Sequence, residues 1–226
     1  MVVTLVLVLA LIGGGSIFGY YYYQNANYVT TEDARVAADT VTITPQIPGK
    51  LITWKVEEGD FVKADQVMGR QDVEASLTSS TINSQVMSAS AGIMAQKAAI
   101  RSPISGQVIQ SKAVLGQMAA PGMTLAVVAD VKNSYISANI KETVINRVKI
   151  GQVVDVEIDA FPDRVFSGRV ESLGKATTSV FSLLPTQNAN GNFTKVTQVI
   201  PVKIKLLDED LDLSPGMSAT VRIHIK

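Results

Sequence analysis

The residues of this chain that could take part in chemistry are few. Its 226 residues include no cysteine and a single histidine, His224. Thiol nucleophiles, disulfides and zinc sites built on cysteine or on several histidines are therefore excluded. His224 lies in the strand-like segment TVRIHIK with no acid close to it in the sequence, so we interpret it as a structural or surface residue.

A second candidate for chemistry is a group of carboxylates near the C-terminus, because carboxylate oxygens bind calcium or magnesium. The group comprises Asp208, Glu209, Asp210 and Asp212. It lacks the glycine-punctuated spacing of a calcium loop, which favours a solvated turn. No G-x-S-x-G elbow occurs, and GGGS at residues 13–16 lacks the lysine of a phosphate-binding loop. The sequence thus predicts no enzyme, no metal site and no cofactor.

The overall charge argues against a nucleic-acid partner. Twenty lysines and arginines balance twenty aspartates and glutamates, so the formal net charge is zero. Proteins that bind nucleic acid usually carry a basic excess. We therefore expect no nucleic acid among the partners.

The N-terminal segment is apolar and uncharged. Residues 2–23 carry no charge, and the first charged side chain is Glu32. About 20 helical residues span a bilayer core, and the tyrosines at 20–23 lie where an interfacial aromatic belt is expected. Gly15 and Gly19 form a GxxxG spacing, which permits close helix packing in lipid. We expect an uncleaved membrane anchor; a cleaved signal peptide and a buried soluble helix are the alternatives.

The centre of the chain contains an internal repeat, with copies at residues 44–72 and 102–130. Each copy has a proline, then two glycines ten residues apart, then a closing aspartate. The four glycines are Gly49, Gly59, Gly106 and Gly116. Strand-like residues lie between each pair, so we expect the glycines in turns and two matching halves that pack into one small sandwich.

This repeat resembles the biotinyl/lipoyl domain fold. In those carriers the modified lysine projects from the hairpin between the two halves, a position that aligns near Ala75. The chain has no lysine between Lys63 and Lys97. We therefore interpret the scaffold as used for its shape, with residues 76–97 as a short insert of helical turns or an ordinary loop.

The C-terminal part reads as short strands separated by turns. VVDVEIDA alternates apolar residues on one face, and RVFSGRVESLG and KVTQVIPVKIKLL follow. Turns are expected at residues 162–163, 174, 190–191 and 215–216, where proline, glycine and asparagine occur. The pattern predicts a small antiparallel β-barrel.

Three segments make the C-terminal resemblance specific. ANIKETVINRVKIGQVVDVEIDAFPD, GRVESLGKATTSVFSLLPTQNANGNFTKVTQVIPVKI and LSPGMSATVRI resemble the barrel of HlyD-type membrane fusion proteins, most of all EmrA-type multidrug-efflux adaptors. With the anchor and the lipoyl-like repeat, the resemblance covers nearly the whole chain. One departure is clear: such adaptors carry a long helical hairpin between the lipoyl halves, which here is abbreviated, either naturally or by deletion.

The resemblance implies a non-enzymatic adaptor of an efflux or secretion system. It would be held by one helix in the cytoplasmic membrane, with its bulk on the extracytoplasmic side. Its partner would be an inner-membrane transporter, of the major-facilitator class rather than an ABC exporter, and its copies would form a trimer or hexamer. Engagement of an outer-membrane channel stays open, and so does the exported substrate.

The expected fold class is mainly β, with an N-terminal transmembrane helix. The boundaries are an anchor at 1–23, a connector at 24–36, a first lipoyl-like half at 37–75, an insert at 76–97, a second half at 98–130 and a barrel domain at 131–226. Two rivals share part of this fold. One is a membrane-attached biotinyl or lipoyl carrier subunit, and the other is an envelope structural module without a transporter.

One loop is the candidate contact with a partner or a neighbouring subunit. Residues 180–196, VFSLLPTQNANGNFTKV, combine apolar side chains with a polar tip, and barrel loops are usually shorter and more polar. The candidate contact residues are Phe181, Leu183, Leu184, Pro185, Asn188, Asn190 and Phe193. The alternative is that these side chains only cover the open end of the barrel.

Overall fold

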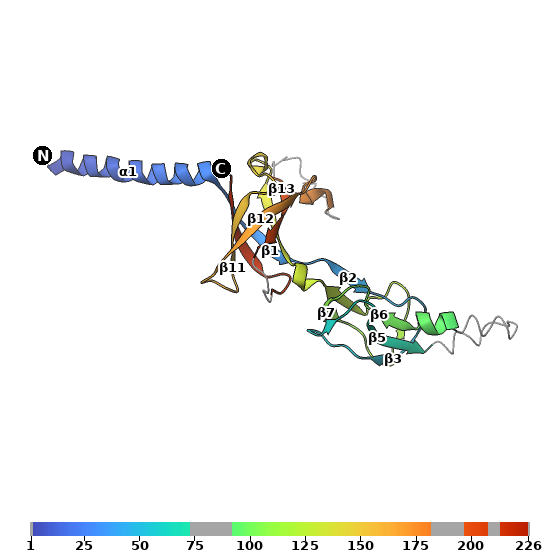
Figure 1. The fold of residues 1–226 in the computed structure, drawn as a ribbon. Helices are drawn as coiled ribbons and strands as arrows, with labels where there is room; N and C mark the ends of the chain where they lie inside the picture. Colours follow the sequence, from blue (N-terminus) through green and yellow to red (C-terminus); the bar gives the residue numbers. More distant parts are fainter. Residues whose placement is uncertain (1, 73–91, 182–196, 208–212, 226) are drawn as a thin grey trace, which may run out of the picture. The chain divides into compact units, whose positions relative to one another are not determined.

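A computed structural model of the chain describes residues 2–72, 92–181, 197–207 and 213–225 (Figure 1). The chain divides into two compact units. The barrel unit takes in Met1–Ala37 and Tyr135–Lys226, and the sandwich unit is Ala38–Ser134. The sandwich unit is therefore inserted in the sequence of the barrel unit, after that unit's first strand.

The chain begins with helix α1, Val2–Asn27. The hydroxyl of Ser16 donates to the carbonyl of Ile12 (2.8 Å), and the side chain of Asn27 donates to the carbonyl of Tyr23 (2.9 Å). The expected N-terminal helix is thus present and extends four residues beyond residue 23. Within the described ranges, no helix was found with the length and apolarity needed to cross a membrane.

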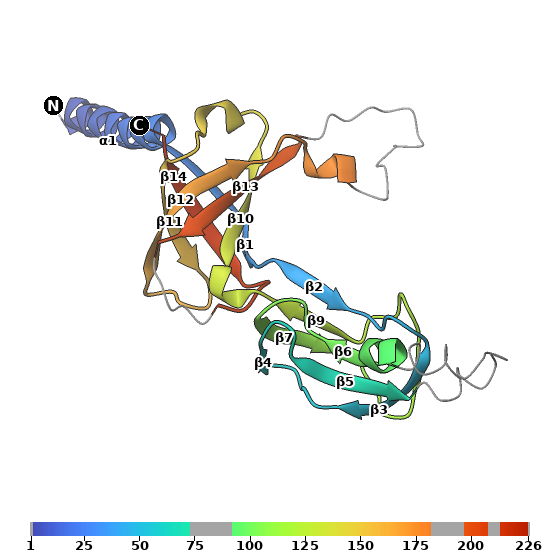
Figure 2. The ribbon, with the colours of Figure 1, turned by 45° about the vertical axis from the view of Figure 1, so that its right-hand side comes forward.

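The barrel unit is a closed barrel of six antiparallel strands, in the order β1-β10-β13-β12-β11-β14 (Figure 2). The barrel predicted from the sequence is confirmed. Its strands are β1 Tyr28–Ala37, β10 Tyr135–Lys141, β11 Val153–Ile158, β12 Val165–Leu173, β13 Val199–Leu206 and β14 Ser218–His224. Two short 3-10 helices, η2 Ile145–Arg147 and η3 Thr178–Phe181, lie between strands.

Strand β1 takes the place of most of the expected connector at 24–36. It pairs with β14 on one side and β10 on the other, and so closes the barrel. Its register shifts between Thr31 and Ala34, which marks a bulge at Glu32 and Asp33. The bulge breaks the alternation of buried and exposed residues, and for this reason the polar sequence TTEDAR reads as a linker.

Alternating side chains of the six strands fill the barrel. Phe166, Val156 and Ile204 are fully buried, on β12, β11 and β13. The apolar residues on the inner face of each strand belong to one cluster. Burial of this apolar area is the main contribution to the stability of the barrel.

The sandwich unit consists of two four-stranded sheets, ordered β2-β9-β7-β4 and β6-β5-β3-β8. The predicted sandwich is confirmed. The first sheet comprises β2 Thr40–Ile43, β9 Ala126–Ala129, β7 Gly106–Ser111 and β4 Phe61–Val62. The second comprises β6 Ala99–Arg101, β5 Val67–Asp72, β3 Gly49–Trp54 and β8 Met118–Ala119. A 3-10 helix, η1 Val131–Asn133, follows β9.

The two copies of the repeat exchange strands. Strand β4 of the first copy pairs with β7 of the second, and β8 of the second pairs with β3 of the first. The turns bond in the same reciprocal way: the Gly59 amide donates to the carbonyl of Val108, and the Gly116 amide to that of Leu51, each at 2.8 Å. Neither half is therefore a complete sheet alone.

Equivalent positions of the two copies also share the core. Leu51 and Val108 are both buried, as are Met68 and Leu125. Of the insert expected at 76–97, the structure describes only residues 92–97, which are helical; residues 73–91 lie outside the described part.

Candidate interaction surfaces

The strand registers place one end of the barrel beside the end of α1. Strand β1 starts directly after the helix, and its first residue, Tyr28, pairs with His224 at the end of β14. Lys141, the last residue of β10, pairs with Val199, the first of β13. The loops at 142–152 and 174–198 therefore both leave the barrel at this end, which we call the α1 end.

Arg147 joins the α1 end of the barrel to the helix itself. From η2, its guanidinium Nη2 donates to the main-chain carbonyls of Asn25 and, at 3.1 Å, Ala26. The last carbonyls of a helix have no partner inside it and carry partial negative charge, so a cation is favourable there. Arg147 thus caps α1 and fixes where the helix leaves the barrel.

The α1 end also exposes apolar side chains. Ile150 is 67% exposed, Val153 is 42% exposed, and Val180 in η3 is 68% exposed. Soluble barrels usually place polar residues at such loop ends. Exposed apolar residues on several loops of one end are typical of a surface that another molecule covers.

The expected contact loop begins at this same end. Phe181 is the last residue of η3, and its side chain lies outside the described part of the chain. Leu183, Leu184, Pro185, Asn188, Asn190 and Phe193 also lie outside it. Residues 174–181, which are the described first part of this loop, follow the end of β12 at the α1 end of the barrel.

A second apolar surface lies in the sandwich unit, at the edge formed by β3 and β8. Met118 on β8 is 67% exposed and pairs with Lys50 of β3. Val114 and Leu115 lie in the preceding turn, whose Gln117 carbonyl accepts from the Leu51 amide (2.8 Å). We call Ile52, Val114, Leu115 and Met118 the edge patch. Strand β8 has a neighbour on one side only, so its other side is open to pairing.

The four repeat glycines occupy two kinds of position. Gly59 and Gly116 lie in turns and have φ of +96° and +86°, in the left-handed region that favours glycine. Gly49 and Gly106 are instead the first residues of β3 and β7. A side chain at Gly106 would collide with the carbonyl of Ala129 on β9, so this glycine allows close strand approach.

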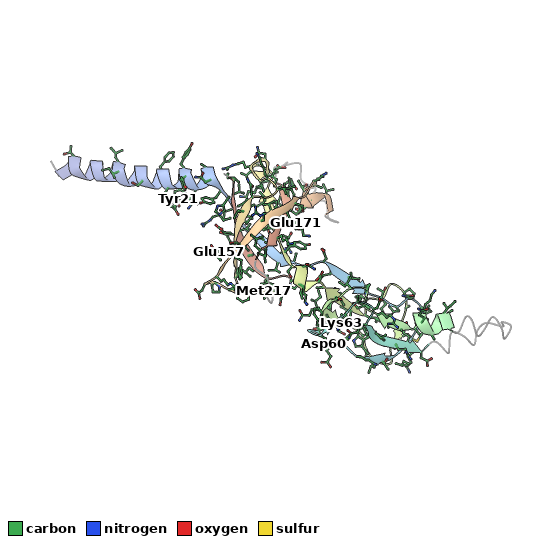
Figure 3. All side chains as sticks on the ribbon, viewed as in Figure 1. Tyr21, Asp60, Lys63, Glu157, Glu171 and Met217 are labelled. Carbon is green, nitrogen blue, oxygen red and sulfur yellow. The ribbon has the colours of Figure 1, made fainter. Side chains whose placement is uncertain are left out.

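The remaining candidates from the sequence have simple placements. Gly15 and Gly19 lie on α1 with open space where a Cβ would point. Lys63 lies in the turn after β4, on the same side of the sandwich unit as Asp60 (Figure 3), and its amide donates to the Gln66 side chain. The carboxylates at 208–212 lie outside the described residues. Elsewhere in the described ranges, no three acidic or histidine side chains gather as metal ligands would.

His224 has a partner that sequence reading missed. Its Nε2 lies 2.8 Å from Oδ2 of Asp155 on β11, and the ring packs edge-on against Tyr28. The two residues are 69 positions apart, so only the β11–β14 register brings them together. The contact joins neighbouring strands on the outside of the barrel, which fits the structural role expected for His224.

Family models match both units. Residues 39–131 match the barrel-sandwich hybrid domain of RND membrane fusion proteins, and residues 134–223 match a YknX-like β-barrel domain. YhbJ of Bacillus subtilis, assigned to an efflux system by its name, is 38% identical over 200 residues, which cover 88% of this chain and 81% of YhbJ. The chain belongs to the membrane fusion protein family.

Further relatives fit this family. The multidrug export protein EmrA of Escherichia coli is 38% identical over 133 residues, or 57% of this chain and 34% of EmrA. The chain thus spans about a third of the length of that relative. Among solved structures, a MacA-MexA chimera with the α-hairpin of Pseudomonas aeruginosa MexA superposes with a TM-score of 0.68 at 21% identity. It covers 88% of this chain and 82% of the chimera, and shows the shared fold.

Proposed function

We propose that this membrane fusion protein is the adaptor subunit of an efflux system, which couples an integral membrane transporter to export across the envelope. The observation that carries the proposal is the 38% identity to YhbJ over both units together. A carrier subunit would need the sandwich alone and a lysine at the junction of its halves. Here the sandwich is inserted within a barrel, and no lysine lies between Lys63 and Lys97.

We place the adaptor in the cytoplasmic membrane, held by α1 as a single span with both units on the extracytoplasmic side. The support is the sequence of α1, which carries no charge over its 26 residues. Arg147 would then fix the barrel to the end of the anchor. Carbonate washing of membranes tests this proposal, because an integral anchor stays in the pellet and a peripheral protein is released.

The α1 end of the barrel is the surface that we assign to the transporter. It faces the bilayer if α1 is the anchor, and it exposes Ile150, Val153 and Val180. The described start of the contact loop, η3 at Thr178–Phe181, lies there as well. We propose a major-facilitator transporter rather than an ABC exporter as the partner, on the basis of the sequence resemblance to EmrA-type adaptors.

We further propose that copies of the chain associate as a trimer or hexamer, in part through the edge patch. A strand with one free side and exposed apolar neighbours is suited to pairing with another copy. We also propose that the short insert between the two halves of the sandwich is a natural feature of the chain and not the result of a deletion. YhbJ, with 81% of its length aligned, has less than a fifth of its chain left for any additional segment.

The function is tested by drug sensitivity. Deletion of the gene should sensitise cells to hydrophobic toxic compounds, and the complete chain supplied from a plasmid should restore resistance. An envelope structural module predicts a different result, namely a general envelope defect with equal sensitivity to detergents and to compounds that no transporter exports.

A further inference from the structure

A pocket of about 230 Å³ lies at the α1 end of the barrel, where the helix meets strand β1. It is lined by Asn25, Tyr28, Val29, Thr30, Thr31, Ile140, Lys141, Val144 and Arg147. The volume accommodates a small polar group together with its bound waters. Two cationic side chains line the pocket, and none of the described lining residues is acidic.

Neither cation forms an ion pair with a carboxylate in the described part of the chain. Among the described residues, the ion pairs are Lys203 with Glu171 and His224 with Asp155, so Lys141 and Arg147 form none. Arg147 uses only Nη2 to cap α1, which leaves the other donors of its five N–H groups. Two uncompensated cations around one pocket create a positive potential that favours an anion.

The surroundings add to this preference. Lys149 follows in the same loop as Arg147, and Lys175 lies in the other loop of the α1 end. The only carboxylate in the described part of these two loops is Glu142. The described part of these two loops therefore carries three cations, Arg147, Lys149 and Lys175, against one carboxylate.

The position of the pocket indicates which anion it meets, and this step rests on the proposed role of α1 as the anchor. Asn27 at the helix end lies four positions after Tyr23, the last of the tyrosine belt. At about 1.5 Å per residue this is about 6 Å, so the pocket lies at the depth of lipid headgroups. Part of its lining is apolar, since Val29, Ile140 and Val144 are among the lining residues. An amphiphile fits such a wall better than a free ion does.

We propose that this pocket binds the phosphate group of an anionic membrane phospholipid, with Lys141 and Arg147 as its cations. Binding would set the height and tilt of the barrel over the bilayer. It would act through the same arginine that holds the end of α1. Inorganic phosphate offers the same charge, and the experiment separates the two sources.

The test uses the full chain in a non-ionic detergent and measures bound lipid by native mass spectrometry. The probes are short-chain phosphatidylglycerol, short-chain phosphatidylcholine and inorganic phosphate at equal concentrations. Phosphatidylglycerol should be retained in preference to phosphatidylcholine and should resist displacement by phosphate. The variant Lys141→Gln leaves the Arg147 cap untouched, and it should weaken retention about five-fold, the contribution of one basic residue near anionic lipid.

Two further variants complete the test. Lys141→Arg keeps the charge and should retain the lipid. Lys205→Gln removes an exposed lysine at the opposite end of the β10–β13 pairing, and it should bind as the unmodified chain does. Equal retention of the two lipids, full displacement by inorganic phosphate, or unchanged binding in Lys141→Gln would each overturn the proposal. Release of the chain by carbonate would instead contradict the anchor, because lipid retention in detergent does not depend on it.

Discussion

Gly59 is a residue of the sandwich unit at which a β-branched side chain should be destabilising because of the backbone conformation. Its φ of +96° lies where β-branched residues are strained, and its amide donates to Val108 of the other repeat copy. Gly59→Val should lower the free energy of unfolding by about 1–3 kcal/mol. The chain's single tryptophan, Trp54, lies on β3 of this unit, so its fluorescence during urea unfolding reports the sandwich.

Gly59→Asn is the matched control, because asparagine tolerates positive φ better than valine does. It should lose clearly less stability than Gly59→Val. Equal midpoints for the two variants and the unmodified chain would show that the turn does not constrain this unit.

Gln71 gives a second test in the same core. It is 2% exposed, and its Nε2 donates to the carbonyls of Gly49 (3.1 Å) and Ala119 (3.0 Å), one from each repeat copy. Gln71→Glu replaces this donor by a carboxylate that faces two carbonyls, so unfolding should become easier by about 3 kcal/mol or more.

The variant Gln71→Met separates the effect of the buried charge from the effect of losing the two hydrogen bonds. It also removes the two hydrogen bonds but buries no carboxylate, so its loss should be smaller, about 1–3 kcal/mol. The same Trp54 signal measures both variants. A Glu variant as stable as the Met variant would contradict the orientation of the Gln71 amide.

At the scale of elements, the glycine spacing of the repeat was enough to predict a sandwich of two halves. The alternation in VVDVEIDA and its neighbours was likewise enough to predict the barrel. Strand β1 was not predicted, because its bulge at Glu32 and Asp33 interrupts the alternation and its sequence is polar. The exchange of β4 and β8 between the halves was also missed, since two-residue strands leave no periodic pattern.

Less of the candidate interaction surfaces than of the fold could be predicted, because their contacts join segments that are distant in the sequence. The contact loop stays a prediction, made from its unusual length and apolar content. The cap of Arg147 on α1 and the contact of His224 with Asp155 depend on strand registers that join distant segments. Nothing in the local sequence of Arg147 marks it as the partner of a helix that ends 120 residues earlier.

The edge patch leads to a prediction about association between copies. Leu115→Glu together with Met118→Glu places two charges on side chains that are 60% and 67% exposed, so folding should be unaffected. Self-association should weaken at least ten-fold in sedimentation velocity, because the charges would have to be buried between copies. Ile109→Glu, on β7 of the same unit, is the control and should associate normally. An unchanged oligomer in the double variant would remove the edge patch from the interface.

The contact loop at 180–196 carries a separate prediction. Leu184→Ser with Phe193→Ser should reduce recovery of the transporter with the adaptor while the melting temperature of the chain stays within a few degrees. The reason is that interface anchors contribute to binding more than to the fold of either partner. Val165→Ser is the control, since Val165 is exposed at the opposite end of the barrel, at the start of β12. Loss of the folded barrel before any assembly defect would instead indicate that these residues only cover the barrel.

In the molecule as a whole, the helix, the barrel and the sandwich unit have separate proposed tasks. Under the proposed function, the helix would hold the chain at the membrane, the α1 end of the barrel would meet the transporter and the bilayer surface, and the sandwich unit would contribute to association between copies. None of these tasks requires a reactive side chain. The composition agrees with this, because the chain has no cysteine and one histidine. That histidine, His224, contacts Asp155.

The most direct test of the adaptor role is recovery of the partner. The full chain, tagged and expressed at its natural level, is extracted from membranes in mild detergent and purified, and its companions are identified and quantified by mass spectrometry. We predict that an integral transporter is recovered in fixed proportion to the chain, and that the proportion falls when Leu184 and Phe193 are replaced by serine. Consistent recovery of the chain as a lone monomer, with no integral membrane protein enriched over an untagged control, would contradict the account.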